Sequence, residues 1–251
     1  MFKHTRTPFF LSLLVALLAC PNVGRAQSAE APPLNFTYQI YYLSGSGGQA
    51  LSKQEMMAGK RYQADPPPEL YTEVDGEATR LSIQPNTASP TYHYRGQSPF
   101  SLYKQEIVEG ETRYAPVVSL PESMRLPNRV LLMLLGSQQS GYKLVPLDVS
   151  AKNLGQGQLL IMNMSGNRLA ARTGKQSIEI APARSATIPM GELVNNRFKL
   201  SVAANESDNW KLIYNSFVIR GSEAPLLALI YPSENGTAGW KVKFVDSPLF
   251  E

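Results

Sequence analysis

Short stretches in which apolar and polar residues alternate recur along most of the chain, and they predict β-strands. Residues 35–43 show the pattern well, because every second side chain is aromatic or aliphatic and these side chains share one face. Tyr41 points to the opposite face. Those on the first face are Phe36, Tyr38, Ile40 and Tyr42. Strands spaced by roughly 8–12 residues, about 14 in all, predict an all-β protein with at most one short helix, over residues 50–60.

Three pairs of strands are separated by turn sequences typical of β-hairpins. Asp-Gly and Asn-Gly favour a type I′ turn, in which both central residues have positive φ. The expected hairpins join residues 70–74 to 78–83 through Asp75-Gly76, residues 100–108 to 113–120 through Glu109-Gly110-Glu111, and residues 225–231 to 240–245 through Asn235-Gly236.

The best candidate for a linker is the Pro-containing segment 121–127. The next segment, 129–135, is almost continuously apolar, which predicts a strand buried on both faces. We therefore expect two immunoglobulin-like β-sandwich domains in tandem, residues 34–122 and 128–251, divided near Leu126. One larger β-sandwich is the alternative.

Residues 1–26 have the composition of a secretory signal peptide. Lys3 and Arg6 precede an apolar run of 11 residues, and Gly24-Arg25-Ala26 places small residues at a cleavage site. The run is too short for a transmembrane helix, which needs about 20 residues. We expect residues 27–33 to form a flexible lead-in, and no later stretch is apolar enough to span a membrane.

Cys20 allows a second interpretation of the same segment. Leu17-Leu18-Ala19-Cys20 resembles a bacterial lipobox, in which the cysteine is lipidated and becomes the new N-terminus. Cleavage after Ala26 would instead remove the chain's single cysteine. An exported protein without disulfides is typical of a bacterial envelope rather than of a eukaryotic cell surface.

The signal segment also explains most of the net charge. The whole chain has a formal charge of +4, but residues 1–26 hold three bases and no acid, which leaves 21 bases and 20 acids. This near-neutral balance argues against nucleic acid as a partner. A small asymmetry remains, since residues 27–127 carry −3 and residues 128–251 carry +4.

Candidate binding residues are tyrosines of the first half, because exposed aromatic rings on a sheet bind glycans or proteins. Alternation places Tyr92 and Tyr94 on one face of a strand, and Tyr41 projects alone from its own strand. We expect these three to form any ligand-binding or partner-binding surface.

Catalytic and metal-binding motifs are weak. His93 is the only histidine after the signal segment and lies in a strand without a nucleophile motif. The acidic pairs Glu73 with Glu77 and Glu106 with Glu111 leave a hydrolase open as an alternative. We expect no catalytic residue, no metal site and no cofactor.

The chain also resembles exported immunoglobulin-like proteins of Gram-negative bacteria whose activity is not known. The resemblance rests on framework segments and implies a fold and a location, but no catalytic residue. The segments are 94–96 with 100–103, 129–135, 159–163 and 209–214.

Together these features predict a non-catalytic protein of the periplasm or outer cell surface. It would act as a protein-interaction or structural module, such as an accessory subunit of a pilus or secretion assembly. Its partners would be envelope proteins or further copies of itself. Glycan binding by exposed tyrosines and hydrolysis are the alternatives.

The two interpretations of the signal segment predict different mature N-termini. Mass spectrometry of the protein isolated from its host should find a chain that starts at Gln27, because signal peptidase cleaves after the small residue Ala26. A triacylated N-terminal Cys20 would contradict this result and establish a lipoprotein.

Overall fold

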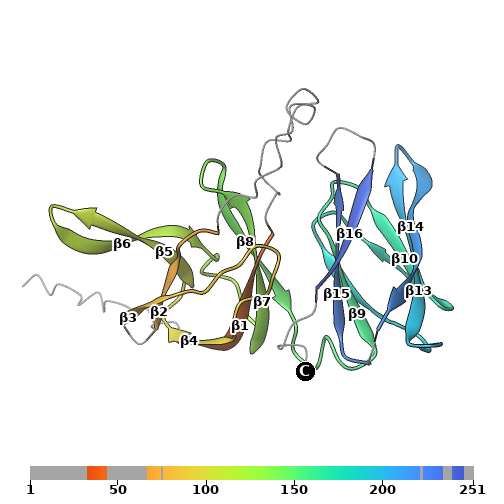
Figure 1. The fold of residues 1–251 in the computed structure, drawn as a ribbon, viewed down its shortest axis with the longest axis horizontal. Coiled ribbons are helices and arrows are strands. Elements are labelled where there is room, and N and C mark those ends of the chain that lie inside the picture. Colours follow the sequence, from red (N-terminus) through yellow and green to blue (C-terminus); the bar gives the residue numbers. More distant parts are fainter. Residues whose placement is uncertain (1–32, 44–66, 75, 221–222, 234–238, 246–251) are drawn as a thin grey trace, which may run out of the picture. The chain divides into compact units, whose positions relative to one another are not determined.

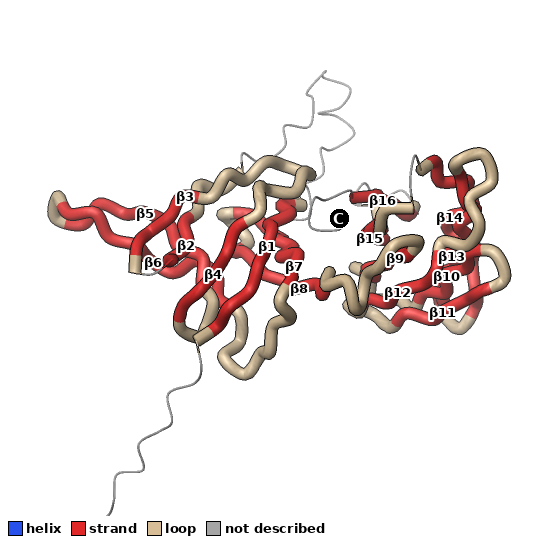
Figure 2. Tube along the Cα trace, turned by 90° about the horizontal axis from the view of Figure 1, so that it is seen from below, coloured by secondary structure: helices blue, strands red, loops and turns tan. Residues whose placement is uncertain are grey.

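The computed structural model describes residues 33–43, 67–74, 76–220, 223–233 and 239–245 (Figure 1). Strands and loops alone make up this part of the chain, as Figure 2 shows, which confirms the all-β class expected from the sequence. None of its elements is a helix able to cross a bilayer. The signal segment, Cys20 and the helix expected over residues 50–60 lie outside the described residues.

The first eight strands form two four-stranded sheets. Sheet 1 has the strand order β3-β2-β5-β6 and consists of β2 Tyr71–Val74, β3 Glu77–Arg80, β5 Ser101–Val108 and β6 Glu111–Ser119. Sheet 2 has the order β4-β1-β7-β8 and consists of β1 Leu34–Tyr42, β4 Tyr92–Gly96, β7 Arg129–Ser137 and β8 Gly141–Asp148. Neighbouring strands are antiparallel except β1 and β7, which run parallel.

The last eight strands form two further sheets of four. Sheet 3 has the order β12-β9-β15-β16 and consists of β9 Gln158–Asn163, β12 Ser185–Pro189, β15 Leu226–Pro232 and β16 Trp240–Val245. Sheet 4 has the order β11-β10-β13-β14 and consists of β10 Leu169–Thr173, β11 Gln176–Ile180, β13 Arg197–Glu206 and β14 Asn209–Ile219. In sheet 3, β9 and β15 run parallel.

Three apolar cores hold these sheets together. The first core joins sheets 1 and 2 and includes Phe36, Phe100 and Leu132. The second joins sheets 3 and 4 and includes Leu159 and Phe198. The third, which we call the middle core, joins sheets 2 and 3, so that the central strands of these two sheets are buried on both faces. Pro32–Glu251 accordingly forms one compact unit.

Strand alternation divides the side chains of the central strands between two cores. In β7, Val130, Leu132 and Leu134 enter the first core, whereas Leu131 and Met133 enter the middle core. This division confirms the prediction that the apolar run 129–135 is buried on both faces. β9 and β15 are divided in the same way between the second core and the middle core, which explains their continuous apolar character.

The expected boundary near Leu126 differs from the observed strand pairing. β7, which we assigned to the second sandwich (residues 128–251), pairs with β1 and lies in sheet 2. The change from the first pair of sheets to the second falls between β8 and β9. Residues 121–127 look like a linker because of their prolines, but Leu126 packs against the first core, so the segment is a loop within the first half.

The hairpins agree with the turn sequences. β2–β3, β5–β6 and β15–β16 are all antiparallel pairs, and Gly76, Glu109 and Gly110 have the positive φ angles that the turn type requires. The Asn235-Gly236 tip lies outside the described residues. The β13–β14 turn has no such signal in the sequence, because Ser207 and Asp208 take positive φ without an Asn-Gly or Asp-Gly pair.

Tyr41 provides a test of the middle core, because its hydroxyl is buried there without a hydrogen-bond partner. We expect Tyr41→Phe to leave the free energy of unfolding unchanged or to raise it by about 1 kcal/mol, since it removes an unsatisfied polar group. Tyr94→Phe is the matched control. It should lower stability by about 1 kcal/mol, because the Tyr94 hydroxyl donates to the Gln97 carbonyl at 2.8 Å.

Burial also holds the pKa of Tyr41 above its ordinary value of 10.0. The folded protein then keeps this proton at a pH where the unfolded chain loses it, so stability is full below pH 10 and falls above it. Urea unfolding at neutral pH and at about pH 11 should show a smaller loss in Tyr41→Phe than in the unchanged protein. An equal loss would contradict the burial of this hydroxyl.

Candidate functional site

Among the described residues, the largest group of exposed apolar side chains lies on β14, at the edge of sheet 4. Trp210, Leu212, Phe217 and Ile219 are all exposed, Ile219 at 80% of its full surface. We call these four residues the β14 row. Monomeric proteins rarely leave large apolar side chains side by side on a surface, so such a row marks an interaction site.

A β-bulge brings the four residues onto one face. The pairing of β13 with β14 shifts between Val202 and Ala203, so that Ile213 has no direct partner. Without this shift, Leu212 and Phe217 would point to opposite faces, since they are five positions apart. With it, both lie beside outward-facing residues of β13, Ala203 and Lys199.

Basic side chains flank the β14 row. The Arg197 guanidinium lies 5.9 Å from the centroid of the Phe217 ring, in a cation–π contact. Lys199 is exposed beside Phe217 on the same outward face, and neither base forms an ion pair in the described part of the chain. Lys211 is held differently, in an ion pair with Glu206 at 3.6 Å. The β14 row is therefore an apolar surface, and the positive charges of Arg197 and Lys199 at its border are not neutralised by an acidic residue in the described part of the chain.

β14 also has one free edge in the described part of the chain, because it is the last strand in the order of sheet 4. An edge strand presents backbone N–H and C=O groups that can pair with another strand. At eleven residues, β14 is long for an unpaired edge. Proteins usually protect such edges, so the combination with apolar side chains favours a partner strand.

The second group of exposed apolar residues lies on the β5–β6 hairpin. β2 pairs with β5 only at Tyr71 and Tyr103, so residues 104–115 form a two-stranded ribbon, which we call the ribbon (Figure 1). Tyr71 supports its base by donating to the Gln105 side chain at 2.8 Å and by a ring contact with Tyr114. Ile107 is 76% exposed.

The two faces of the ribbon differ in charge. Strand pairing puts four uncharged side chains on one face: Gln105, Ile107, Thr112 and Tyr114. The opposite face carries the ion pairs Lys104–Glu106 at 2.7 Å and Arg113–Glu111 at 3.4 Å. The uncharged face is the one that can meet another apolar surface without the cost of burying a charge.

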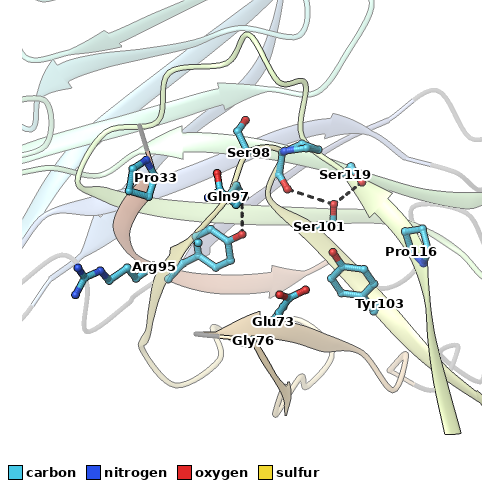
Figure 3. Close-up of a pocket in the computed structure, with 13 residues that line it drawn as sticks. Pro33, Glu73, Gly76, Arg95, Gln97, Ser98, Ser101, Tyr103, Pro116 and Ser119 are labelled. Atoms are coloured by element: carbon cyan, nitrogen blue, oxygen red, sulfur yellow. Dashed lines mark hydrogen bonds between the residues drawn. The ribbon is translucent and has the colours of Figure 1, made fainter. Parts of the chain in front are cut away.

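A shallow cleft of about 620 Å³ lies between the β2–β3 hairpin and the base of β5–β6 (Figure 3). Its lining includes the Tyr103 ring, the Glu73 carboxylate and the hydroxyls of Ser101 and Ser119, which share a hydrogen bond of 2.7 Å. Burial, together with the neighbouring Tyr103 and Glu73, raises the pKa of Tyr94 at the cleft wall. These groups can hold a small polar molecule.

The cleft has no set of groups for nucleophilic catalysis. The Ser101 hydroxyl donates to the Pro99 carbonyl at 3.4 Å and shares a hydrogen bond with the Ser119 hydroxyl, and no histidine or lysine lines the cleft. His93 lies elsewhere, exposed on β4, with its Nδ1 atom 3.0 Å from the Thr37 hydroxyl. A nucleophile needs a base within hydrogen-bond reach, which neither place provides.

The acidic pairs that left a hydrolase open as an alternative are separated or already paired with bases in the described part of the chain. Glu106 and Glu111 are each paired with a base of their own strand, and Glu73 lies across from Ala78 rather than Glu77. No group of three or more metal-ligating side chains occurs among the described residues.

The prediction that Tyr41, Tyr92 and Tyr94 form an exposed binding surface is wrong. Tyr41 is 1% exposed and belongs to the middle core, where its ring lies 5.8 Å from the Lys243 ammonium. Tyr94 is 6% exposed in the first core. Tyr92 is partly buried against the same core, and its hydroxyl accepts the backbone N–H of Ser82 at 2.7 Å. The alternation was predicted correctly, but these rings face inward.

No known family model and no curated protein matches this sequence. Among solved structures, the chain is similar to the two tandem C2 domains of extended synaptotagmin 2, with 13% identity, a TM-score of 0.24 and coverage of 96% of both chains. A structure of the SMP domain of extended synaptotagmin 2 together with both C2 domains gives 13% identity, the same TM-score, and coverage of 90% of this chain and 59% of that one. A likeness at this level carries no inference about the fold or its activity.

The outward orientation of the β14 row can be tested by fluorescence, because the chain has only two tryptophans. Trp210 is 46% exposed, whereas Trp240 is partly buried and its indole N–H donates to the Glu206 carboxylate at 3.1 Å. Tryptophan emission in Trp240→Phe should be at longer wavelength and more strongly quenched by acrylamide than in Trp210→Phe. The reverse order would contradict the outward orientation of Trp210.

Proposed function

We propose that the protein is a non-catalytic, exported module of the cell envelope that binds another protein chain through the β14 row. The observation that carries the proposal is the apolar row on a free edge strand, which combines side-chain contact with backbone pairing. Addition of a strand to an exposed sheet edge is a common mode of protein recognition.

Two features of the site support binding rather than catalysis. The exposed side chains of the row are Trp, Leu, Phe and Ile, which contribute contact area, and tryptophan in particular is frequent at binding hot spots. Beside Phe217, the titratable groups Arg197 and Lys199 are bases, which orient a partner and attract opposite charge. Export to the periplasm or outer surface is part of the proposal and rests on residues 1–26.

The proposal includes a finer assignment of the fold. We infer that the two pairs of sheets are immunoglobulin-like sandwiches in tandem, each with its own core between two sheets of four strands. Such modules serve as subunits of surface assemblies, for example in pilus or secretion systems. This role is inferred from architecture, which by itself permits many functions.

Photo-crosslinking in the host cell tests the proposal. A photoreactive phenylalanine analogue in place of Phe217 should give covalent adducts with a protein chain, because Phe217 is exposed in the row. The matched control places the analogue at Ser177, which is exposed on β11 at the other edge of sheet 4. Adding Leu212→Ser should reduce the Phe217 adduct several-fold, since it removes a neighbouring contact.

Fractionation of the same cells tests the proposed location of the protein. Adducts should appear in the periplasmic or outer-membrane fraction. The absence of protein adducts from all four positions of the row, or equal adducts from Ser177, would show that the row does not bind a protein chain.

A further inference from the structure

We propose that the partner strand belongs to a second copy of this chain, whose ribbon docks on the β14 row. This inference rests on the proposed function and names the partner. Both surfaces come from one sequence, so each molecule would carry a donor (the ribbon) and an acceptor (the β14 row).

Exposed apolar side chains are the first argument. The eight large apolar residues exposed in the described part of the chain fall on two places only. Ile107, Val108 and Tyr114 lie on the ribbon, and the four residues of the β14 row lie with Val194 at one end of β13–β14. Pairing β6 with β14 would bring Ile107 and Tyr114 beside the row on one sheet face, so that each group shields part of the other from water. Val108 lies on the opposite face of the ribbon and takes no part in this contact.

Strand edges are the second argument. β6 ends the strand order of sheet 1 just as β14 ends that of sheet 4, and residues 111–115 of β6 form the outer edge of the ribbon. If β6 adds to β14, the ribbon can be oriented so that its uncharged face, with Ile107 and Tyr114, continues the apolar face of the β14 row. Backbone hydrogen bonds then form along both free edges.

Charge is the third argument, and it distinguishes this pairing from a symmetric one. The ribbon carries Glu106, Glu109 and Glu111 against two bases, and Glu109 at its tip has no ion pair in the described part of the chain. The β14 row is bordered by Arg197 and Lys199. Opposite charges would meet in a ribbon–row contact, whereas two β14 rows would bring like charges together.

The layer order prevents the same contact within one molecule. The ribbon belongs to sheet 1 and the row to sheet 4, and sheets 2 and 3 pack between them through the three cores. A ribbon–row contact between copies is therefore heterologous. It leaves one free ribbon and one free row at the ends, so that assembly continues into longer chains.

Two variants and their mixture test this pairing. The ribbon variant combines Ile107→Ser with Glu109→Lys, and the row variant combines Leu212→Ser with Phe217→Ser. All four side chains are exposed, so both variants should keep the near-ultraviolet circular dichroism of the unchanged protein. Glu122→Lys, at an exposed position outside both surfaces, controls for the charge change.

Sedimentation should show that the mass of the unchanged protein and of Glu122→Lys rises with concentration beyond that of a dimer. Each variant alone should associate at least about tenfold more weakly, as expected when a central contact is lost. An equimolar mixture should form a dimer and stop there, because each variant retains one intact surface. High salt should weaken association of the unchanged protein.

Several results would overturn the inference, and they separate it from the proposed function. If the ribbon variant still dimerises and the row variant does not, two β14 rows bind each other. If the unchanged protein stays monomeric while Phe217 crosslinks to a different protein, the second copy is the wrong partner and the proposed function stands. If it stays monomeric, gives no adduct and binds anionic phospholipid vesicles through the row, both proposals fail.

Discussion

The middle core between sheets 2 and 3 is the interaction on which the rest of the structure depends. It collects twelve buried residues, including Tyr41, Leu131 and Leu229, and nine of the twelve come from strands that also serve an outer core. Complete burial of one such aliphatic side chain stabilises the fold by about 1.5–3 kcal/mol. Without this contact both central sheets would expose an apolar face, so the two halves need each other. The shared core joins them into one unit, in which sheets 1 and 4 are the outer sheets.

The sequence was a good guide wherever structure depends on neighbours in the chain. Alternation correctly placed Tyr38 and Tyr41 on opposite faces of β1, and Asp75-Gly76 and Glu109-Gly110 correctly located two hairpins. The domain boundary was harder, because the parallel pairing of β1 with β7 joins segments far apart in the chain and has no local signal. The boundary was therefore predicted from the prolines of residues 121–127, which do give a local signal.

The candidate site was missed for a similar reason. Tyrosines looked like the natural binding residues, yet alternation does not say which face of a strand lies against the core. Tyr94 and Tyr41 turned out to be core residues, and the exposed aromatics were Trp210 and Phe217. Strict alternation would also have put Leu212 and Phe217 on different faces, and only the bulge at Ile213 unites them. A bulge without a glycine or proline signal is invisible in a single sequence.

The pairing of β1 with β7 also determines the order in which the chain can fold. A polypeptide that emerges N-terminus first presents β1 early, but its parallel partner begins only at Arg129. Until β7 has emerged, Tyr38, Ile40 and Tyr41 lack the strand that pairs with them in the folded protein. Contacts between segments so far apart in the chain form slowly. A chain with this topology carries an unpaired, apolar strand through the first half of its emergence, which is the state in which aggregation competes with folding.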